Sequence, residues 1–332
     1  MTNYEYDVTG IGNAIVDVLA HATDAFVQEK GLTKGAMTLV DADQAEHLYE
    51  TMGPGTEISG GSAGNTMAGI ASLGGRGAYV GKVKNDQLGE VFRHDIRAAG
   101  LTFDTPAADD GPPTARCLIL VTPDAQRTMC TFLGACTELG PDDVHEDLVK
   151  ASQVTYMEGY LWDPPEAKKA FLKAAEIAHA NGRKVSLSLS DGFCVDRHRA
   201  EFRELVDHHV DILFANETEI LSLYETTDFD AAVQQVRGKC EYVALTRSEK
   251  GSIILNGGDA HHVDIERVGK VVDTTGAGDL YAAGFLYGVT HGLSPVDSGK
   301  LGALCASEVI SHMGARPDQD LAELAKSRGL SL

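Results

Sequence analysis

The pattern of apolar and polar positions predicts strands that alternate with amphipathic helices along most of this chain. After residue 140 the alternation is regular, with strands expected at 154–157, 185–189, 211–214, 242–245 and 252–255. The helices expected in this part begin at Asp163, 199, Asn216, 230, 276 and 299, and the last extends to 313. Such alternation indicates an α/β fold with a doubly wound, mainly parallel sheet that carries helices on both faces.

The first part of the chain adds strand patterns of a different kind. Strands are expected at 8–11, 16–19, 36–40 and 78–83, and helices from Asp41 onward, at 65–73 and at 86–99. Residues 115–122 and 127–133 form two further apolar runs that the turn 123–126 joins into a hairpin. We therefore expect one α/β domain over residues 1–332 with a small added β-sheet, built from about 13–20, 35–40 and 115–134.

Composition and charge narrow the class of protein. The 332 residues are 43% hydrophobic and carry a formal net charge of -21, which argues against binding to nucleic acid or to an anionic membrane surface. No apolar run reaches 18 residues, and the polar, acidic first seven residues are unlike a signal peptide. The six cysteines are scattered without a C-x-x-C pair, which favours reduced thiols and a cytoplasmic location.

Residues 273–279, Asp-Thr-Thr-Gly-Ala-Gly-Asp, are the strongest candidate for chemistry. They stand between a short strand-like run, 269–272, and an apolar helical pattern, so the three small residues 276–278 fall at a helix N-terminus. Free backbone N–H groups and the helix dipole favour an anion there. Asp279 could accept a proton from a substrate hydroxyl beside that anion, or it could be an ordinary first-turn acid after a tight glycine turn. The local chemistry leaves both interpretations open.

Other polar residues follow the expected strands, where open α/β sheets bind their ligands. They are Asn13, Glu158, Ser190, Asp191, Asn216, Thr246 and Arg247. Asn216 and Glu219 could bind phosphate and water-coordinated Mg²⁺, or could only cap a helix. A second glycine-rich loop, 60–65, ends in Asn65, which could likewise be only a cap. The Gly-Ile-Gly start of a dinucleotide fingerprint fails at Ile15, which disfavours an oxidoreductase of that type.

Three motifs together resemble a known family. Residues 273–279, followed by Ala-Ala-Gly-Phe at 282–285, resemble the C-terminal signature of the ribokinase-like (PfkB-type) carbohydrate and nucleoside kinases. The loop 60–65, continuing to Gly81 and to Asp-x-x-Gly at 86–89, resembles the N-terminal signature, and residues 216–219 match Asn-x-x-Glu. The motifs span essentially the whole chain in the family's order. The resemblance implies a doubly wound core with a small β lid, and transfer of the ATP γ-phosphate to a substrate hydroxyl.

The resemblance also implies roles for individual residues. Asp279 would be the base, and the anion hole would be formed by Gly276, Ala277 and Gly278. Substrate hydroxyls would be held by Asn13, Asp17, Gly60, Gly61 and Asn65. Asn216 and Glu219 would organise the phosphates and Mg²⁺. The nucleotide would lie near Thr246, Arg247 and Gly251. A monovalent cation, such as K⁺, is expected near Asp273 and Thr275.

Several stretches are similar to the adenosine kinases of this family, above all residues 210–219. Phe193 matches an aromatic residue that contacts the purine in those enzymes, and Leu161 would supply a second apolar wall, unless both are core residues. Gly64 departs from the pattern, because adenosine kinases usually carry glutamine there and sugar kinases often carry glycine. The expected acceptor is the 5′-hydroxyl of adenosine. A free sugar such as ribose, and more remotely a non-catalytic nucleoside- or sugar-binding protein, stay as alternatives, and the chain is expected to be a monomer or a homodimer.

Overall fold

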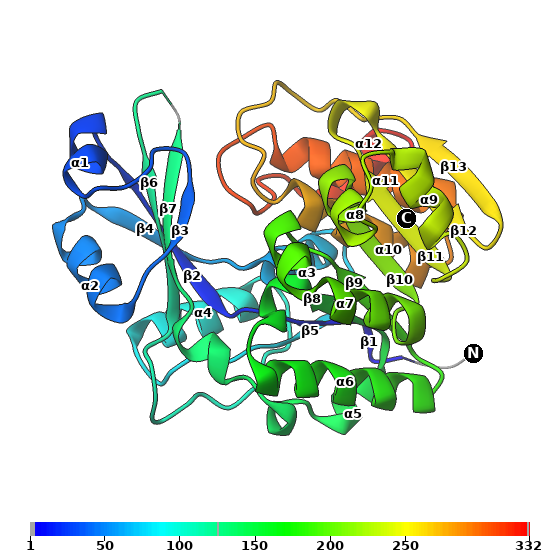
Figure 1. Ribbon diagram of the computed structural model, residues 1–332, viewed down its shortest axis with the longest axis horizontal. Coiled ribbons are helices and arrows are strands. Elements are labelled where there is room, and N and C mark those ends of the chain that lie inside the picture. The colour runs from blue at the N-terminus through cyan, green and yellow to red at the C-terminus, as the bar shows by residue number, and fades with distance from the viewer. Residues whose placement is uncertain (1–3, 125, 331) are drawn as a thin grey trace.

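The computed structural model describes residues 4–124, 126–330 and 332 and arranges them around two β-sheets (Figure 1). The strands are β1 (Tyr6–Ile11), β2 (Ile15–His21), β3 (Met37–Leu39), β4 (Gly55–Ser59), β5 (Gly77–Val80), β6 (Ala115–Val121), β7 (Arg127–Phe132), β8 (Ser152–Glu158), β9 (Lys184–Ser188), β10 (Ile212–Asn216), β11 (Tyr242–Thr246), β12 (Ser252–Asn256) and β13 (Asp259–Val263). The helices are α1 (Asp24–Glu29), α2 (Ala42–Thr51), α3 (Ser62–Ser72), α4 (Gln87–Ala98), α5 (Glu146–Ala151), α6 (Pro165–Ala180), α7 (Gly192–His208), α8 (Glu217–Leu223), α9 (Phe229–Val236), α10 (Ala277–Thr290), α11 (Pro295–Val309) and α12 (Leu321–Ser327).

The large sheet has eight strands in the order β13-β12-β11-β10-β9-β8-β1-β5. All neighbours from β5 to β11 are parallel, and the edge strands β12 and β13 are antiparallel. Side chains alternate between two cores: Ile212 and Phe214 face one cluster with α3, α10 and α11, whereas Leu213 and Ala215 face the other with α6 to α9. Both faces are therefore buried, and the expected doubly wound α/β fold is confirmed.

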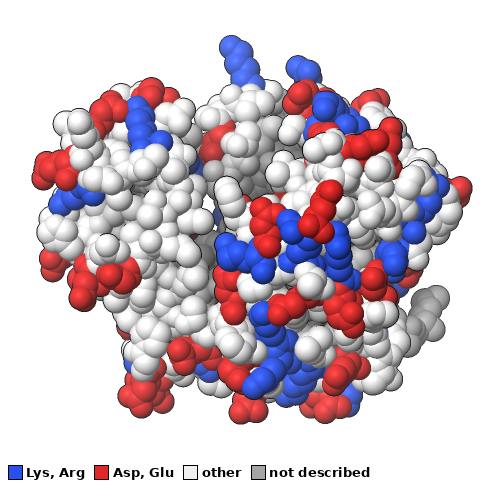
Figure 2. Space-filling view, viewed as in Figure 1, with Lys and Arg blue, Asp and Glu red and all other residues white. Residues whose placement is uncertain are grey.

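The small sheet has five strands in the order β3-β7-β6-β2-β4. Strands β6 and β7 form the expected antiparallel hairpin, and β2 runs parallel to β6. One face shares a core with α1 and α2, and the other presents Ile15, Cys117, Ile119 and Val121. This sheet and its helices form a lobe beside the main body (Figure 1), and a hollow lies between the two in the space-filling view (Figure 2).

Several helix boundaries differ from the sequence-based expectation because loop residues provide the caps. Helix α3 begins at Ser62 rather than 65, since Gly61, with φ of 84°, is its N-cap, and Asn65 lies inside the helix. Helix α7 begins at Gly192 rather than 199, because the Asp191 carboxylate accepts from the N–H groups of Phe193 and Cys194. The kink at His198 hides this earlier start from a periodicity argument.

Two other helices also begin elsewhere than expected. Helix α6 begins at Pro165 after an N-cap at Pro164, while Asp163, the expected cap, pairs with Arg197 and His198. Helix α11 covers 295–309 rather than 299–313, because the Ser294 side chain caps its first turn. Strands β4 and β13 and helices α5 and α12 were not anticipated, since each is short and weakly patterned.

The strand expected at 269–272 is absent from the structure. Val271 and Val272 are 66% and 49% exposed, and the Val272 N–H bonds to the carbonyl of Ile310 at the end of α11. Valine favours strands only where a neighbouring strand and a core accept it, and neither is present here. Helix α10 therefore follows a loop and not a strand. Among the helices that the structure describes, none is both long and apolar enough to cross a membrane.

Candidate active site

The N-terminus of α10 has the geometry of an anion site. Gly276 is its N-cap with a left-handed φ of 78°, and a Cβ there would lie 2.9 Å from Ala315. Gly278 is exposed, and a Cβ built on it would meet no atom within 4 Å. The N–H of Ala277 donates to the carbonyl of Thr274 at 3.3 Å. Because the first N–H groups of a helix have no intrahelical acceptor, this open end can still receive a phosphate oxygen.

Asp279 lies in the first turn of α10 and contacts the first turn of α3. Its carboxylate accepts from Ser62 Oγ at 2.6 Å and from Asn65 Nδ2 at 3.0 Å. Burial raises the pKa of Asp279 to about 6, while these two hydrogen bonds and Arg316 oppose the rise. The carboxylate is thus ionised at neutral pH and still more basic than an exposed aspartate, as a proton acceptor requires.

Glu158, at the end of β8, joins the start of α3, which contacts Asp279, to the connection between β1 and β2. It is buried and accepts from the N–H of Asn13 at 2.9 Å and from the N–H of Ala63 at 2.6 Å. The Asn13 side-chain amide donates to the same carboxylate, and burial raises the pKa of Glu158 to about 7. Glu158 therefore fixes the β1–β2 connection against the start of α3.

The residues expected to hold substrate hydroxyls lie together around these groups. Asp17 projects from β2 beside Gly60, where a Cβ would overlap its carboxylate. A Cβ on Gly61 would overlap the carbonyl of Asn13, so both glycines are needed for this close approach. Burial raises the pKa of Asp17 to about 6, and Arg316 and Arg127 oppose the rise.

Asn216 and Glu219 form a reciprocal capping box at the start of α8. The N–H of Glu219 donates to Asn216 Oδ1 at 2.9 Å, and the N–H of Asn216 donates to Glu219 Oε2 at 2.9 Å. Burial raises the pKa of Glu219 to about 7, with the carboxylates of Asp191 and Asp279 adding to it. The pair caps the helix. A cation near Glu219 would also relieve the repulsion between its carboxylate and those of Asp191 and Asp279. Within the described residues, no cluster of three or more His, Cys, Asp or Glu forms a metal cage.

The residues expected near a nucleotide follow the next strand along the same edge. Thr246 is the register partner of Asn216 in the parallel pair β10–β11. Arg247 forms a 2.7 Å ion pair with Glu217, and its guanidinium lies 3.8 Å from the centroid of the Phe229 ring. Gly251 has φ of 77°, and a Cβ there would overlap the carbonyl of Val263. This arrangement places the three predicted residues at one corner of the sheet.

Asp273 connects the α10 loop to the small sheet. Its carboxylate pairs with Arg127 of β7 at 2.8 Å and accepts from the N–H of Thr275 at 3.1 Å and of Gly314 at 3.0 Å. Thr275 Oγ1 also donates to Asp273 at 2.7 Å, and Arg127 Nη1 donates to Thr275 Oγ1 at 3.3 Å. A buried guanidinium from the small sheet thus stands beside the anion site.

The two residues expected to form apolar purine walls are placed differently. Leu161 is 1% exposed and belongs to the core that includes Trp162 and Phe171. Phe193 is 76% exposed in the first turn of α7, which follows β9 in the chain. Of these two residues, Phe193 is therefore accessible to a ligand and Leu161 is not.

Three residues of this region were not among those predicted for the site: Ser62, Arg127 and Arg316. Glu158 was predicted only as one of the polar residues that follow a strand, without a role. Ser62 lies inside the glycine-rich motif and Glu158 follows a strand, so the position of each in the sequence could have indicated a place in the site. Arg127 begins a hairpin strand and Arg316 lies in a loop after α11, where no local pattern distinguishes them from surface arginines.

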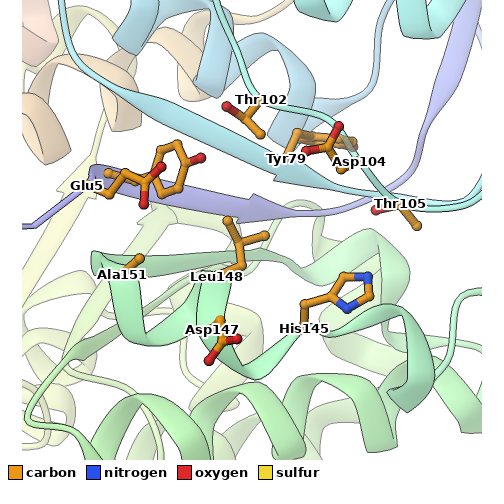
Figure 3. Close-up of a pocket in the computed structure, with 10 residues that line it drawn as sticks. Glu5, Tyr79, Thr102, Asp104, Thr105, His145, Asp147, Leu148 and Ala151 are labelled. Carbon is orange, nitrogen blue, oxygen red and sulfur yellow. The ribbon is translucent and has the colours of Figure 1, made fainter.

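A cavity of about 310 Å³ lies away from this site, at the amino end of β1 (Figure 3). Its lining includes Tyr6, Asp104, His145 and Leu148, and none of the predicted site residues. It is therefore separate from the candidate active site.

Comparisons with known proteins identify the family and the fold. The family model described as pfkB family carbohydrate kinase matches residues 36–321. Adenosine kinase from Saccharomyces cerevisiae is 27% identical, over 92% of this chain and 94% of that protein. The crystal structure of adenosine kinase from Sinorhizobium meliloti is 56% identical with a TM-score of 0.90, covering 98% of this chain and 99% of that one. The crystal structure of a probable sugar kinase from Rhizobium etli is 53% identical with a TM-score of 0.92, covering 99% of this chain and 100% of that one.

Proposed function

The chain belongs to the pfkB family of carbohydrate kinases, and from this premise we propose that it transfers the γ-phosphate of ATP to the 5′-hydroxyl of adenosine. Relatives named adenosine kinase or sugar kinase cover nearly the whole chain, so it is a phosphotransferase with a hydroxyl acceptor. The observation that carries the proposal is the basic Asp279 carboxylate, held by α3 beside the open N-terminus of α10.

In this mechanism the chain positions the reactants and stabilises charge. Asp279 accepts the proton of the acceptor hydroxyl as that oxygen bonds to phosphorus and the bond to the leaving phosphate breaks. The N–H groups of residues 276–278 stabilise the negative charge on the transferring phosphoryl group, and the Arg127 guanidinium beside Thr275 adds a positive charge. Phosphoryl transfer asks mainly for such positioning and charge stabilisation.

ATP and Mg²⁺ fit the donor set at the sheet edge. A magnesium ion supplies charge neutralisation on the phosphates, and Glu219 with Asn216 would orient it through water, consistent with the sparse protein ligation that Mg²⁺ accepts. Thr246, Arg247 and Gly251 would border the nucleotide. Because Arg247 is held by Glu217 and Phe229, it is pre-oriented at this corner.

Sugar hydroxyls would be held by the polar group around Asp17 and Asn65, together with Asn13, Gly60 and Gly61. The small sheet carries Asp17 and Arg127, so we propose that it acts as a lid that delivers both side chains to the bound substrate. Phe193 would stack on the purine, whereas the enclosed Leu161 would only support the wall from behind.

Purified enzyme should phosphorylate adenosine with a kcat/KM about tenfold above that for ribose, because stacking on Phe193 adds about 1.4 kcal/mol. An ATP-coupled assay with adenosine, other nucleosides, ribose and related sugars measures this preference. Phe193→Ala should raise KM for adenosine about tenfold. The control variant Phe26→Ala, on α1, should leave it unchanged.

A strong preference for ribose would contradict the assignment of adenosine as the acceptor and would favour the alternative, a free sugar. That alternative is favoured by Gly64 and by the name of the 53% identical probable sugar kinase. Binding of adenosine without any transfer would instead favour the remote alternative, a non-catalytic nucleoside-binding protein.

We also propose that a monovalent cation such as K⁺ activates the enzyme through the 273–275 loop. The Asp273 carboxylate already accepts three hydrogen bonds and forms an ion pair with Arg127, so its side chain does not fit such an ion. Backbone carbonyl oxygens of the loop would have to bind it. Activity should be several-fold higher in potassium chloride than in tetramethylammonium chloride at equal ionic strength. Equal activity in the two salts would exclude this proposal.

A further inference from the structure

Arg316 reaches the candidate active site from the loop between α11 and α12. Its Nε donates to Asn65 Oδ1 at 3.2 Å, and its Nη2 donates to Ser59 Oγ at 3.1 Å. The two partners lie 251 and 257 residues earlier in the sequence. One side chain therefore joins the C-terminal loop to the first turn of α3 and to the end of β4 in the small sheet.

Gly64 leaves room for this guanidinium. A Cβ built on Gly64 would lie 3.6 Å from Arg316 Nη2, which is ordinary van der Waals contact. A longer side chain at this buried helical position would extend into the space that the guanidinium occupies. The glycine and the arginine are therefore complementary, although no motif links them in the sequence.

The loop that carries Arg316 is anchored on both sides. Glu308 is fully buried in α11 and accepts from the N–H groups of Asp318 and Gln319, each at 3.1 Å. On the other side, Gly314 donates to Asp273, and Ala315 packs against Gly276. The arginine is thus held by the same loop that supports the anion site. A residue that positions others must itself be fixed in this way.

The hydrogen bond to Asn65 has a directional consequence. The guanidinium is only a donor, so the amide oxygen of Asn65 must face it and the amide NH₂ must face Asp279. Without that donor only the Asp279 carboxylate would hold the amide, and the Asn65 side chain could swing away from its present position. Arg316 also supplies positive charge near both Asp17 and Asp279.

We propose that Arg316 is a positioning residue for phosphoryl transfer, which orients the Asn65 amide on Asp279 and fixes the end of β4, and that Gly64 admits it. The inference rests on the kinase activity proposed above. It predicts that the loss of Arg316 impairs use of the acceptor and the chemical step, and not the binding of ATP.

The first test compares Arg316→Met and Arg316→Lys with the wild type in full kinetics on ATP and adenosine. Arg316→Met should lower kcat/KM for adenosine about 30-fold, since small misplacements of reacting groups have effects of this size. KM for ATP should change less than about threefold, because Arg316 contacts no residue assigned to the nucleotide. Arg316→Lys keeps the charge and should recover part of the loss. Arg328→Met, an exposed arginine of the same C-terminal segment, should match the wild type.

The pH profile distinguishes a positioning role of Arg316 from a purely structural role, because a structural role would leave the profile unchanged. Loss of the guanidinium should raise the pKa of Asp279, so the acid limb of kcat/KM should move to higher pH in Arg316→Met. The other ionisable groups that act on or respond to Asp279 are Asp17, Tyr156, Glu158, Tyr160 and Glu219. Arg316→Lys should leave the limb close to its wild-type position.

A second pair of variants tests the same contact without removing the arginine. Gly64→Leu should displace the guanidinium and lower kcat/KM for adenosine as Arg316→Met does, whereas Gly64→Ala should lose much less. Combining Gly64→Leu with Arg316→Met should add little, because both changes remove one contact. These variants carry the test if Arg316→Met does not fold, as judged by circular dichroism.

The outcomes separate this inference from the proposed function. Normal transfer by the wild type, together with unchanged kinetics in Arg316→Met and Gly64→Leu, overturns the inference alone. An equal loss for ATP and adenosine, with no recovery in Arg316→Lys and no shift of the acid limb, also overturns it. Absence of transfer by the wild type to any nucleoside or sugar overturns the proposed function and this inference together.

Discussion

Asp279→Asn is expected to lower kcat at least about 100-fold, which corresponds to about 2.7 kcal/mol of transition-state stabilisation. The amide has nearly the same shape as the carboxylate and can keep a hydrogen bond with Ser62, but it cannot accept the proton of the acceptor hydroxyl. KM for ATP should stay within about threefold, because only the chemical step loses a partner. Steady-state kinetics with ATP and adenosine measure both quantities.

The matched control is Asp297→Asn, which changes a first-turn acid of α11 that a serine also contacts. It should leave kcat unchanged, since Asp297 lies outside the site. The pH profile assigns the base: kcat/KM of the wild type should rise tenfold per pH unit below about 6, where Asp279 is protonated, and level off above pH 7. Loss of that limb in Asp279→Asn would assign it to Asp279 and not to Asp17, Glu158 or Glu219, whose pKa values burial also raises to about 6 or 7. Near-normal turnover of Asp279→Asn would show that Asp279 is not the base.

Arg127→Met is expected to lower kcat about 100-fold, the scale found when a preorganised group that stabilises developing charge is removed. The change removes the guanidinium beside Thr275 and leaves the buried Asp273 carboxylate without its ionic partner. An uncompensated negative charge next to the N-terminus of α10 would then oppose the phosphoryl group. Single-turnover measurements with saturating ATP would show the loss in the chemical step.

Arg116→Met provides the comparison for this prediction. Arg116 is also a buried arginine of the small sheet in an ion pair, but its partner is Glu46 on α2. The Arg116→Met variant should lose as much stability as Arg127→Met or less. Its kcat should stay within about threefold of the wild type, because nothing near the anion site changes. If both variants lost activity equally, the effect of Arg127 would be structural. Arg127→Lys, which keeps the charge, should fall between the wild type and Arg127→Met.

The regular half of the fold could be predicted because its pattern is local. Strands β8 to β12 and the helix start at Asn216 follow from hydrophobic period and cap chemistry within a few residues. Predictions were wrong where a distant contact decides the outcome. The valines at 271 and 272 have strand propensity but no neighbouring strand, and Asp163 pairs with side chains more than thirty residues away instead of capping α6.

The sequence by itself determined the class of protein, because the three motifs of the family each lie within a few residues. The local chemistry of these loops still allowed either a helix cap or a catalytic acid. Only the tertiary structure decided which side chains complete the site. Arg127 meets Thr275 across 148 residues, and Arg316 meets Asn65 across 251. Hydrophobic periodicity reports which face of an element is buried, but not which element it meets. A polar contact between two loops depends on how the two sheets and their helices pack, and that packing brings Asp279, Asn65 and Arg316 together.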